Sequence, residues 1–156
     1  MLEYGQMGAE ESLQRLGIVL PEPPSPGGNY LSAKQVGNLV YLAGVISQEN
    51  GSILTGTAGL DKTIDEGYHA ARSCALVQLA ALRGLLGTLE DVREVVSVNG
   101  YVNAVAGFPD SPKVINGASD LLVAVFGDAG KHVRAAIGVS GLPRNALVEL
   151  QMVVAV

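Results

Sequence analysis

VRAAIGVSGLPRNALVELQMVVAV, residues 133–156, is the stretch that decides the fold. Apolar residues alternate with others over 133–140, which predicts a strand with one apolar face. The apolar character of 147–156 predicts a final strand, and the short loop 141–146 joins the two. We therefore expect these strands to pair antiparallel.

Two charged side chains stand within these otherwise apolar strands. Arg134 lies on the face opposite Val133, and Glu149 lies inside the last strand. Antiparallel pairing would place the two at similar depth. A guanidinium suits two-pronged binding of a carboxylate, and a nearby glutamate can hold or activate a water. The pair is a candidate site; the alternatives are a structural ion pair across two strands or a contact between subunits.

Two amphipathic helices are expected before this stretch. Thr63–Glu66 is a capping box that opens the first, which ends near Gly87, and Asp110–Pro112 opens the second, which ends at Gly127. Cys74 lies in the apolar stripe of the first helix, so we interpret it as a small buried residue rather than a reactive thiol. The expected buried faces consist of Ala70, Ala71, Cys74, Val77, Ala81, Leu82 and Leu85 in the first helix and Val114, Ile115, Ala118, Leu121, Leu122 and Val125 in the second.

The rest of the sheet is expected before and between these helices. Asn50-Gly51 indicates a tight turn, and the apolar run Leu39–Leu42 is typical of a strand covered on both faces. The expected strands are Tyr30–Ala33, Asn38–Ser47 and Val92–Ala104. The order ββ(β)αβαββ predicts an α+β fold in which a mixed sheet packs against two helices.

The N-terminal part is expected to form an arm rather than a domain. Residues 9–16 suit a short helix, and the prolines of PEPPSPGG (21–28) exclude regular structure. We therefore divide the chain into residues 1–29, a helix and Pro-rich arm, and residues 30–156, the main domain. Met1–Ser12 has acidic residues and no apolar core, unlike a signal peptide, and no apolar run reaches the roughly 20 residues of a membrane span. A cytoplasmic location is expected.

The composition of the chain argues against several classes of function, among them nucleic-acid binding and metal binding. The chain has 156 residues, of which 48% are hydrophobic and 16% charged, as suits one domain with buried subunit interfaces. Its net charge is −5 and its basic residues are scattered, which argues against binding nucleic acid. The single cysteine, Cys74, excludes an internal disulfide and a zinc site built on several cysteines. His69 and His132 lie in different expected elements, so we expect no metal site.

Two segments resemble the RidA/YjgF family. GNLVYLAG (37–44) is similar to its G-N-L-V-F-V-S-G segment. Arg134, Leu142-Pro143 and Val148–Leu150 follow its C-terminal signature, and Ile115-Asn116 matches the V-N of its second helix. The resemblance covers residues 30–156. Two further features are similar to a divergent subgroup of this family. They are the N-terminal extension with its Pro-rich arm and the helix 113–122.

This resemblance implies a chorismate-mutase-like fold, a homotrimer, and clefts between neighbouring subunits. The implied reaction hydrolyses a 2-imino or enamine acid, such as 2-aminoacrylate, to a 2-keto acid and ammonia without a cofactor. The implied partner is a small metabolite that carries a carboxylate. Arg134 would bind that carboxylate and Glu149 would position the attacking water. Tyr30, Gly44 and Asn116 match pocket-lining positions, and the carbonyl of Ala136 is available to hold a water.

Three positions depart from the family pattern. Ala43 stands where many members have Ser, Val45 where Gln often follows, and Ala136 where Cys is frequent. The expected cleft therefore lacks a hydroxyl, an amide and a thiol. Two alternative functions stay open. The missing polar groups suit a non-catalytic trimer that binds a small metabolite, and the names given to family members suggest an endoribonuclease or translation inhibitor.

Overall fold

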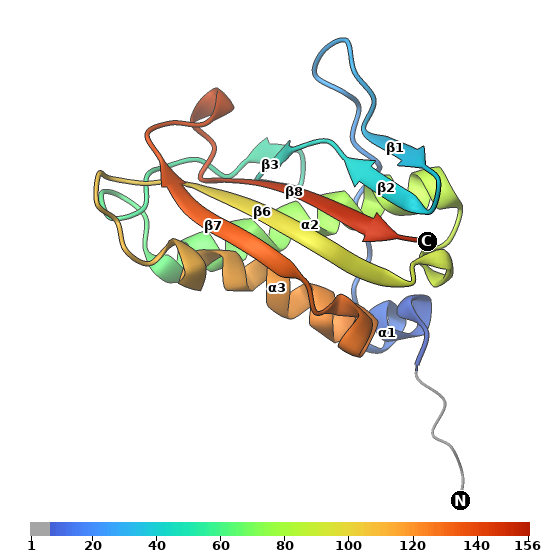
Figure 1. The fold of residues 1–156 in the computed structure, drawn as a ribbon. Helices are drawn as coiled ribbons and strands as arrows, with labels where there is room; N and C mark the ends of the chain where they lie inside the picture. Colours follow the sequence, from blue (N-terminus) through green and yellow to red (C-terminus); the bar gives the residue numbers. More distant parts are fainter. Residues whose placement is uncertain (1–6) are drawn as a thin grey trace, which may run out of the picture.

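The computed structural model describes residues 7–156 as one sheet with two long helices on one of its faces (Figure 1). The helices are α1 Ala9–Arg15, α2 Ile64–Leu86 and α3 Ser111–Phe126. The strands are β1 Ala33–Val36, β2 Leu39–Leu42, β3 Val45–Ile46, β4 Gln48–Glu49, β5 Ser52–Ile53, β6 Glu94–Asn103, β7 Val133–Val139 and β8 Val148–Ala155. Met1–Gln6, half of the segment used to argue against a signal peptide, lie outside the described residues.

The sheet has the order β1-β2-β8-β6-β7, with β3 paired to β8. Strands β6 and β7 are parallel and the other neighbours are antiparallel. The predicted α+β class, the mixed sheet and the order of elements are confirmed. A separate hairpin, β4–β5, turns at Asn50-Gly51, as predicted, and both residues have positive φ.

The predicted antiparallel pairing of the last two strands is wrong. Strand β6 lies between β7 and β8 and pairs with both. The unit β6-α3-β7 is a helical crossover, and a crossover joins parallel neighbours. Strand β8 therefore occupies the other edge of β6, and the loop after β7 carries the chain across the end of β6.

The helix predictions hold with one exception. Thr63 Oγ1 accepts a hydrogen bond from Glu66 N, and the Glu66 carboxylate accepts one from Thr63 N, so the capping box of α2 is present. The helix ends at Gly87, which is left-handed. All the predicted core residues of α3 are buried. In α2 only Leu85 is wrong: it is exposed in the last turn, beyond the part of the helix that the sheet covers.

Strand boundaries differ from the prediction in the N-terminal half. The first strand begins at Ala33 rather than Tyr30 and extends to Val36. The predicted strand 38–47 is broken at Ala43-Gly44, between β2 and β3. The buried side chain of Gln78 explains the break, because its Nε2 donates to Ala43 O (2.9 Å) and to Leu150 O (2.8 Å). A side-chain amide there replaces the strand-to-strand hydrogen bonds.

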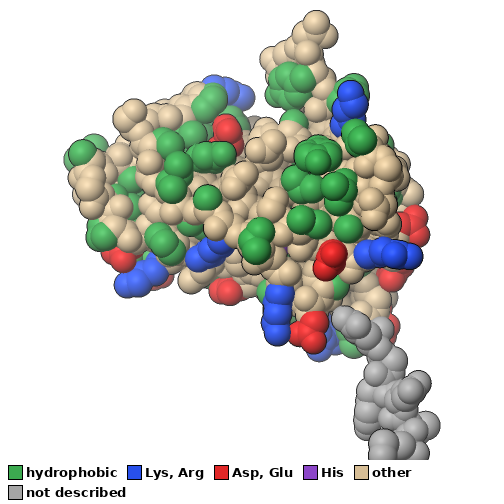
Figure 2. Space-filling model, in the orientation of Figure 1, with side chains coloured by type: hydrophobic (Ala, Val, Ile, Leu, Met, Phe, Trp, Pro, Cys, Tyr) green, Lys and Arg blue, Asp and Glu red, His purple; other side chains and the backbone are tan. Residues whose placement is uncertain are grey.

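The sheet face away from the helices is open and apolar. Tyr41 is 47% exposed, so only one face of the run Leu39–Leu42 is covered, contrary to the prediction. On β7, Val133 and Ile137 are 72% and 49% exposed, while Arg134 takes the face toward the helices. Figure 2 shows hydrophobic side chains gathered on this face of the molecule.

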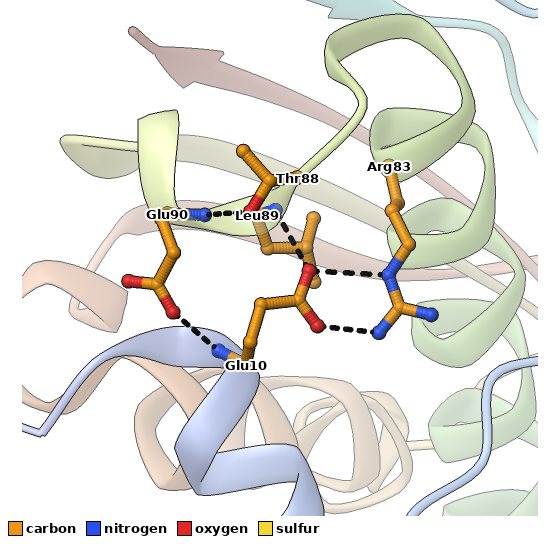
Figure 3. Close-up of polar contacts among 5 residues, drawn as sticks. All are labelled: Glu10, Arg83, Thr88, Leu89 and Glu90. Atoms are coloured by element: carbon orange, nitrogen blue, oxygen red, sulfur yellow. Dashed lines mark hydrogen bonds and ion pairs between the residues drawn. The ribbon is translucent and has the colours of Figure 1, made fainter.

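Four hydrogen bonds tie the N-terminal helix α1, predicted over 9–16, to the last turn of α2 and to the short 3-10 turn Leu89–Asp91 that follows it (Figure 3). The Glu10 carboxylate accepts from Arg83 Nη2 at 2.6 Å and Nε at 3.2 Å, and from Leu89 N at 3.0 Å. In return, Glu10 N donates to the Glu90 carboxylate at 2.9 Å. Burial alone would raise the pKa of Glu10, but these bonds hold it below the usual value. We call this group the α1 clasp.

Within residues 7–156, no helix is long and apolar enough to cross a membrane.

Candidate functional site

Three of the predicted site residues lie in one cavity. It has a volume of about 430 Å³ and is bounded by the Pro-rich arm, the break between β2 and β3, and the turn before β8. Tyr30, Gly44 and Glu149 all line it. We call it the Glu149 cavity.

Glu149 lies in this cavity because β8 pairs with β3 at Ile46↔Glu149 and the open face of the sheet carries its side chain. A Cβ on Gly44 would stand 3.0 Å from Glu149 Oε2, so the carboxylate packs against the glycine backbone. No hydrogen bond or ion pair from another residue of the described chain holds the carboxylate. Burial raises the pKa of Glu149, which makes its ionised form a stronger base than an exposed glutamate.

The Pro-rich arm closes one side of the cavity. The Tyr30 hydroxyl accepts a hydrogen bond from Gly27 N at 3.1 Å, and Ser32 Oγ donates to Pro24 O at 3.1 Å. These two bonds fold the arm back on itself. Pro23 also packs on α2, where a Cβ on Gly84 would lie 3.4 Å from the proline ring. The arm therefore forms a wall and not a free tail.

The other predicted site residues form a second cluster, between β7 and α3. Arg134 Nη1 donates to Ser119 Oγ at 3.0 Å and Nη2 to Pro112 O at 3.1 Å. Asn116 lies between these two positions on α3, four residues after Pro112 and three before Ser119, and so on the same helix face. Ala136 follows Arg134 by two residues and shares its face of β7.

His132 completes the support of Arg134. Its Nδ1 lies 2.6 Å from Gly130 O, a carbonyl that can only accept, so Nδ1 carries the proton. In the neutral ring Nε2 then accepts from the Ser119 hydroxyl at 2.9 Å, which leaves Ser119 Oγ to accept from Arg134. Sequence reasoning placed His132 and His69 in different elements, which is right, but missed that His132 orients the arginine through Ser119.

A single chain does not bring the two clusters together. Arg134 is level with Val98 of β6, which is buried against the helices, whereas Glu149 is level with Tyr101. Tyr101 comes three positions after Val98, and side chains alternate between faces along a strand. Arg134 and Glu149 therefore project from opposite faces of the sheet, and the predicted juxtaposition within one chain is wrong.

Arg144 is the residue that sequence reasoning missed. It lines the Glu149 cavity from the turn Pro143–Asn145. Its φ is +57°, a conformation that an arginine rarely adopts, and Asn145 has the same φ. The sequence signal was weak: Asn145 tolerates this conformation, but nothing local marks Arg144 as doing so.

The single thiol takes no part in either cluster. Cys74 is fully buried, with its Sγ 3.6 Å from Val45 O and Val148 O, and burial raises its pKa well above the usual range. The interpretation of Cys74 as a buried apolar residue is confirmed. Over residues 7–156 no group of three or more His, Cys, Asp or Glu side chains is placed to hold a metal ion.

Sequence comparison now decides the family. The pattern of the family described as "YjgF/chorismate mutase-like, putative endoribonuclease" matches residues 10–155. The chain belongs to the YjgF/RidA family. This YjgF/RidA chain is 41% identical over 145 residues to Protein TCP17 of Trypanosoma cruzi, which covers 92% of this chain and 91% of TCP17. The resemblance drawn from 37–44 and the C-terminal signature is thereby confirmed.

Two further YjgF/RidA relatives bear on fold and chemistry. The crystal structure of a protein described as a "putative endoribonuclease", from Shewanella oneidensis, has a TM-score of 0.92 at 30% identity, and the match covers 96% of this chain and 100% of that one. A 2-iminobutanoate/2-iminopropanoate deaminase of Dermatophagoides farinae is 29% identical over 140 residues, which is 89% of this chain and 94% of that protein.

Proposed function

We propose that this protein hydrolyses 2-imino acids in clefts between the copies of a homotrimer. The Glu149 cavity of one copy and the Arg134 cluster of its neighbour would form each cleft. Two observations support the assembly. The two clusters lie on opposite faces of one sheet, so a neighbouring copy is needed to build one cleft from both, and the open face exposes Val133 and Ile137, the kind of apolar surface that is common at interfaces between subunits.

The Arg134 guanidinium would bind the carboxylate of the imino acid. Two bonds to α3, on Ser119 Oγ and Pro112 O, already hold it in one orientation. The remaining N–H groups are free to form a paired contact with a carboxylate, which orients the imine carbon before reaction.

Glu149 would act on the water. The water oxygen bonds to the imine carbon as the C=N electron pair moves onto nitrogen and takes up a proton. Glu149 accepts that proton from the attacking water and delivers it to nitrogen, which gives a carbinolamine. Glu149 then takes the second water proton from the hydroxyl group and passes it to nitrogen as the C–N bond breaks, so that ammonia leaves and the C=O of the keto acid forms. A carboxylate whose pKa is raised by burial is a stronger base than an exposed one, which suits this shuttle. The half-buried carboxylate in its cavity against Gly44 is the observation that carries the proposal.

The test follows imine trapping. An L-amino-acid oxidase generates imines, and semicarbazide traps whatever stays unhydrolysed. We expect this protein to lower trapping, and we expect Arg134→Ala and Glu149→Gln not to. Arg93→Ala is the matched control, because Arg93 is exposed and lines none of the clusters. Equal trapping with and without the protein, for every amino acid tried, would refute the deaminase proposal.

A non-catalytic binding protein is the second candidate. Ala43 and Val45 line the Glu149 cavity where a hydroxyl and an amide are common in the family, so fewer polar groups face the ligand. In that case keto acids would raise the melting temperature while trapping stayed unchanged. Ribonuclease activity is less well supported, because the net charge is −5 and no basic run exists to hold a nucleic-acid backbone.

A further inference from the structure

Arg144 has an unusual backbone that the rest of the fold keeps in place. Both Arg144 and Asn145 have φ of +57°, in the left-handed region that costs side-chain-bearing residues free energy. Such conformations persist only where surrounding contacts over-determine them, and they occur preferentially at binding and catalytic sites. The question is therefore what holds this turn and what it presents.

Buried groups from distant parts of the chain hold the turn. Asn103, which is only 4% exposed at the end of β6, donates from Nδ2 to Asn145 Oδ1 at 3.3 Å. Gly56 N donates to Asn145 O at 3.0 Å. The turn also closes on itself, since Asn145 N donates to Leu142 O at 3.2 Å. Two separate segments and a bond within the turn thus keep Arg144 in the lining of the Glu149 cavity.

The Glu149 cavity contains two charged side chains that do not pair with each other. Among residues 7–156, Arg144 and Glu149 are the two charged residues of the lining. Arg144 forms no hydrogen bond or ion pair with any residue of the described part of the chain. The pKa of Glu149 is raised by burial, with no lowering from Arg144, so the two side chains are not an ion pair. Arg144 is exposed and lines the same cavity as Glu149, and the donors of its guanidinium form no bond with the described residues.

We infer that Arg144 binds a second carboxylate of the ligand, so that the preferred substrates are the imines of acidic amino acids. The inference rests on the proposed function, in which Arg134 of the neighbouring copy takes the carboxylate next to the imine. Among amino-acid imines, those of aspartate and glutamate carry another anionic group. The free guanidinium fits it with paired hydrogen bonds, and a cavity of about 430 Å³ has room for a five-carbon diacid.

The test compares two keto acids of equal length, which are stable products of the proposed reaction. 2-Oxoglutarate carries a second carboxylate and 2-oxopentanoate ends in a methyl group. Their affinities for the full chain, measured by the rise in melting temperature and by calorimetry, give a preference ratio. We expect 2-oxoglutarate to bind about ten- to a hundredfold more tightly, as one charge-assisted contact supplies.

Three variants make the assignment specific. Arg144→Gln should bring the ratio close to one, and it adds no backbone strain because glutamine meets the same φ as arginine. Arg144→Lys should keep part of the ratio, since it keeps the charge but not the paired donors. Arg134→Gln should weaken both acids together and leave their ratio standing.

The inference would be overturned if the unmodified protein bound 2-oxoglutarate and 2-oxopentanoate equally well. It would also be overturned if the preference for 2-oxoglutarate survived in Arg144→Gln. Neither outcome bears on imine hydrolysis. The opposite outcome can be recognised as well. If the preference for 2-oxoglutarate is high and depends on Arg144, but the protein does not lower imine trapping, the proposed catalysis is refuted and the binding of an acidic ligand by Arg144 stands. If neither acid raises the melting temperature, the Glu149 cavity is not a keto-acid site and the inference falls with the proposed function.

Discussion

The carboxylate of Glu149 lies against the backbone of Gly44, where a Cβ would stand 3.0 Å from Oε2. Gly44 follows Ala43, whose carbonyl accepts from Gln78, at the break between β2 and β3. The glycine is thus required for space, since its φ is not in the left-handed region. The position of the candidate base depends on the absence of one methyl group.

Gly44→Ala should displace this carboxylate while the protein stays folded. The contact is with the end of a flexible side chain, so the side chain can move at little cost. A shift of a few tenths of an ångström relieves the contact, and since a shift of about 1 Å costs roughly a hundredfold, we expect kcat to fall by a few fold. Gly141→Ala is the control, because nothing lies within 4 Å of the added Cβ. Equal kcat for the two variants would show that the contact does not position Glu149.

Ile137→Lys should prevent trimer formation. The side chain is 49% exposed on the open sheet face, and a buried lysine without a partner would disfavour an interface there. Size-exclusion chromatography with light scattering measures the mass. We expect a trimer for the unmodified protein and for Val19→Lys, whose residue is exposed on the N-terminal arm, and a monomer for Ile137→Lys. A trimeric Ile137→Lys protein would place the interface elsewhere.

Ionisation of Glu149 should destabilise the single chain as pH rises. Burial raises its pKa in the fold, so the folded state holds its proton in a pH range where the unfolded chain has lost it. Stability from this group is full below the ordinary glutamate pKa and is lost as pH rises through the raised value. Glu149→Gln cannot ionise and should escape that loss.

The measurement is best made in a Val133→Lys background, which should likewise prevent trimer formation and so remove the neighbouring Arg134. Val133 is level with Ser97 of β6, so its new charge stays away from Glu149, whereas Ile137 is level with Tyr101, as Glu149 is. The melting temperature of the added Glu149→Gln variant should exceed its parent's at pH 7, and the gap should narrow toward pH 4. A gap that is the same at both values would mean that Glu149 is not desolvated.

Glu10→Gln should weaken the α1 clasp with the opposite pH dependence. Its lowered pKa means that stability is present above the ordinary glutamate pKa and is lost as pH falls through the lowered one. We expect a loss of about 1 kcal/mol at pH 7, or roughly 2–4 °C in melting temperature, for a partly exposed ion pair with an added backbone bond. The loss should shrink in acid. Glu11→Gln, on the exposed side of α1, is the control and should show no pH-dependent loss.

Ser119→Ala should raise KM more than it lowers kcat. The hydroxyl accepts from Arg134 and donates to His132, so its removal leaves the guanidinium with the Pro112 carbonyl alone. A carboxylate anchor that acts equally on substrate and transition state affects KM, here by about tenfold. Ser119→Thr keeps the hydroxyl and should keep KM near that of the unmodified protein. Matching kinetics for the two variants would assign Ser119 a role in packing only.

The helices could be predicted because their signals are local. The capping box at Thr63–Glu66 and the stop at Gly87 act within one or two turns of chain, and both were correct. Asn50-Gly51 likewise needs only its own backbone to turn. The family signature around Arg134 and Glu149 was also visible in sequence, because it consists of residue types at fixed spacing.

By itself the sequence determined the element order, the helix ends, the family and the candidate residues of its signature, but not Arg144. Only the tertiary structure decided which strands are neighbours, since β6 comes between β7 and β8 from a distant part of the chain. Alternation along β7 showed two faces but not which one the helices cover, and the face with Arg134 is the covered one. Arg144 reaches the Glu149 cavity through bonds from Asn103 and Gly56 to its neighbour. Packing between segments far apart in the chain makes these choices, and no local pattern encodes it.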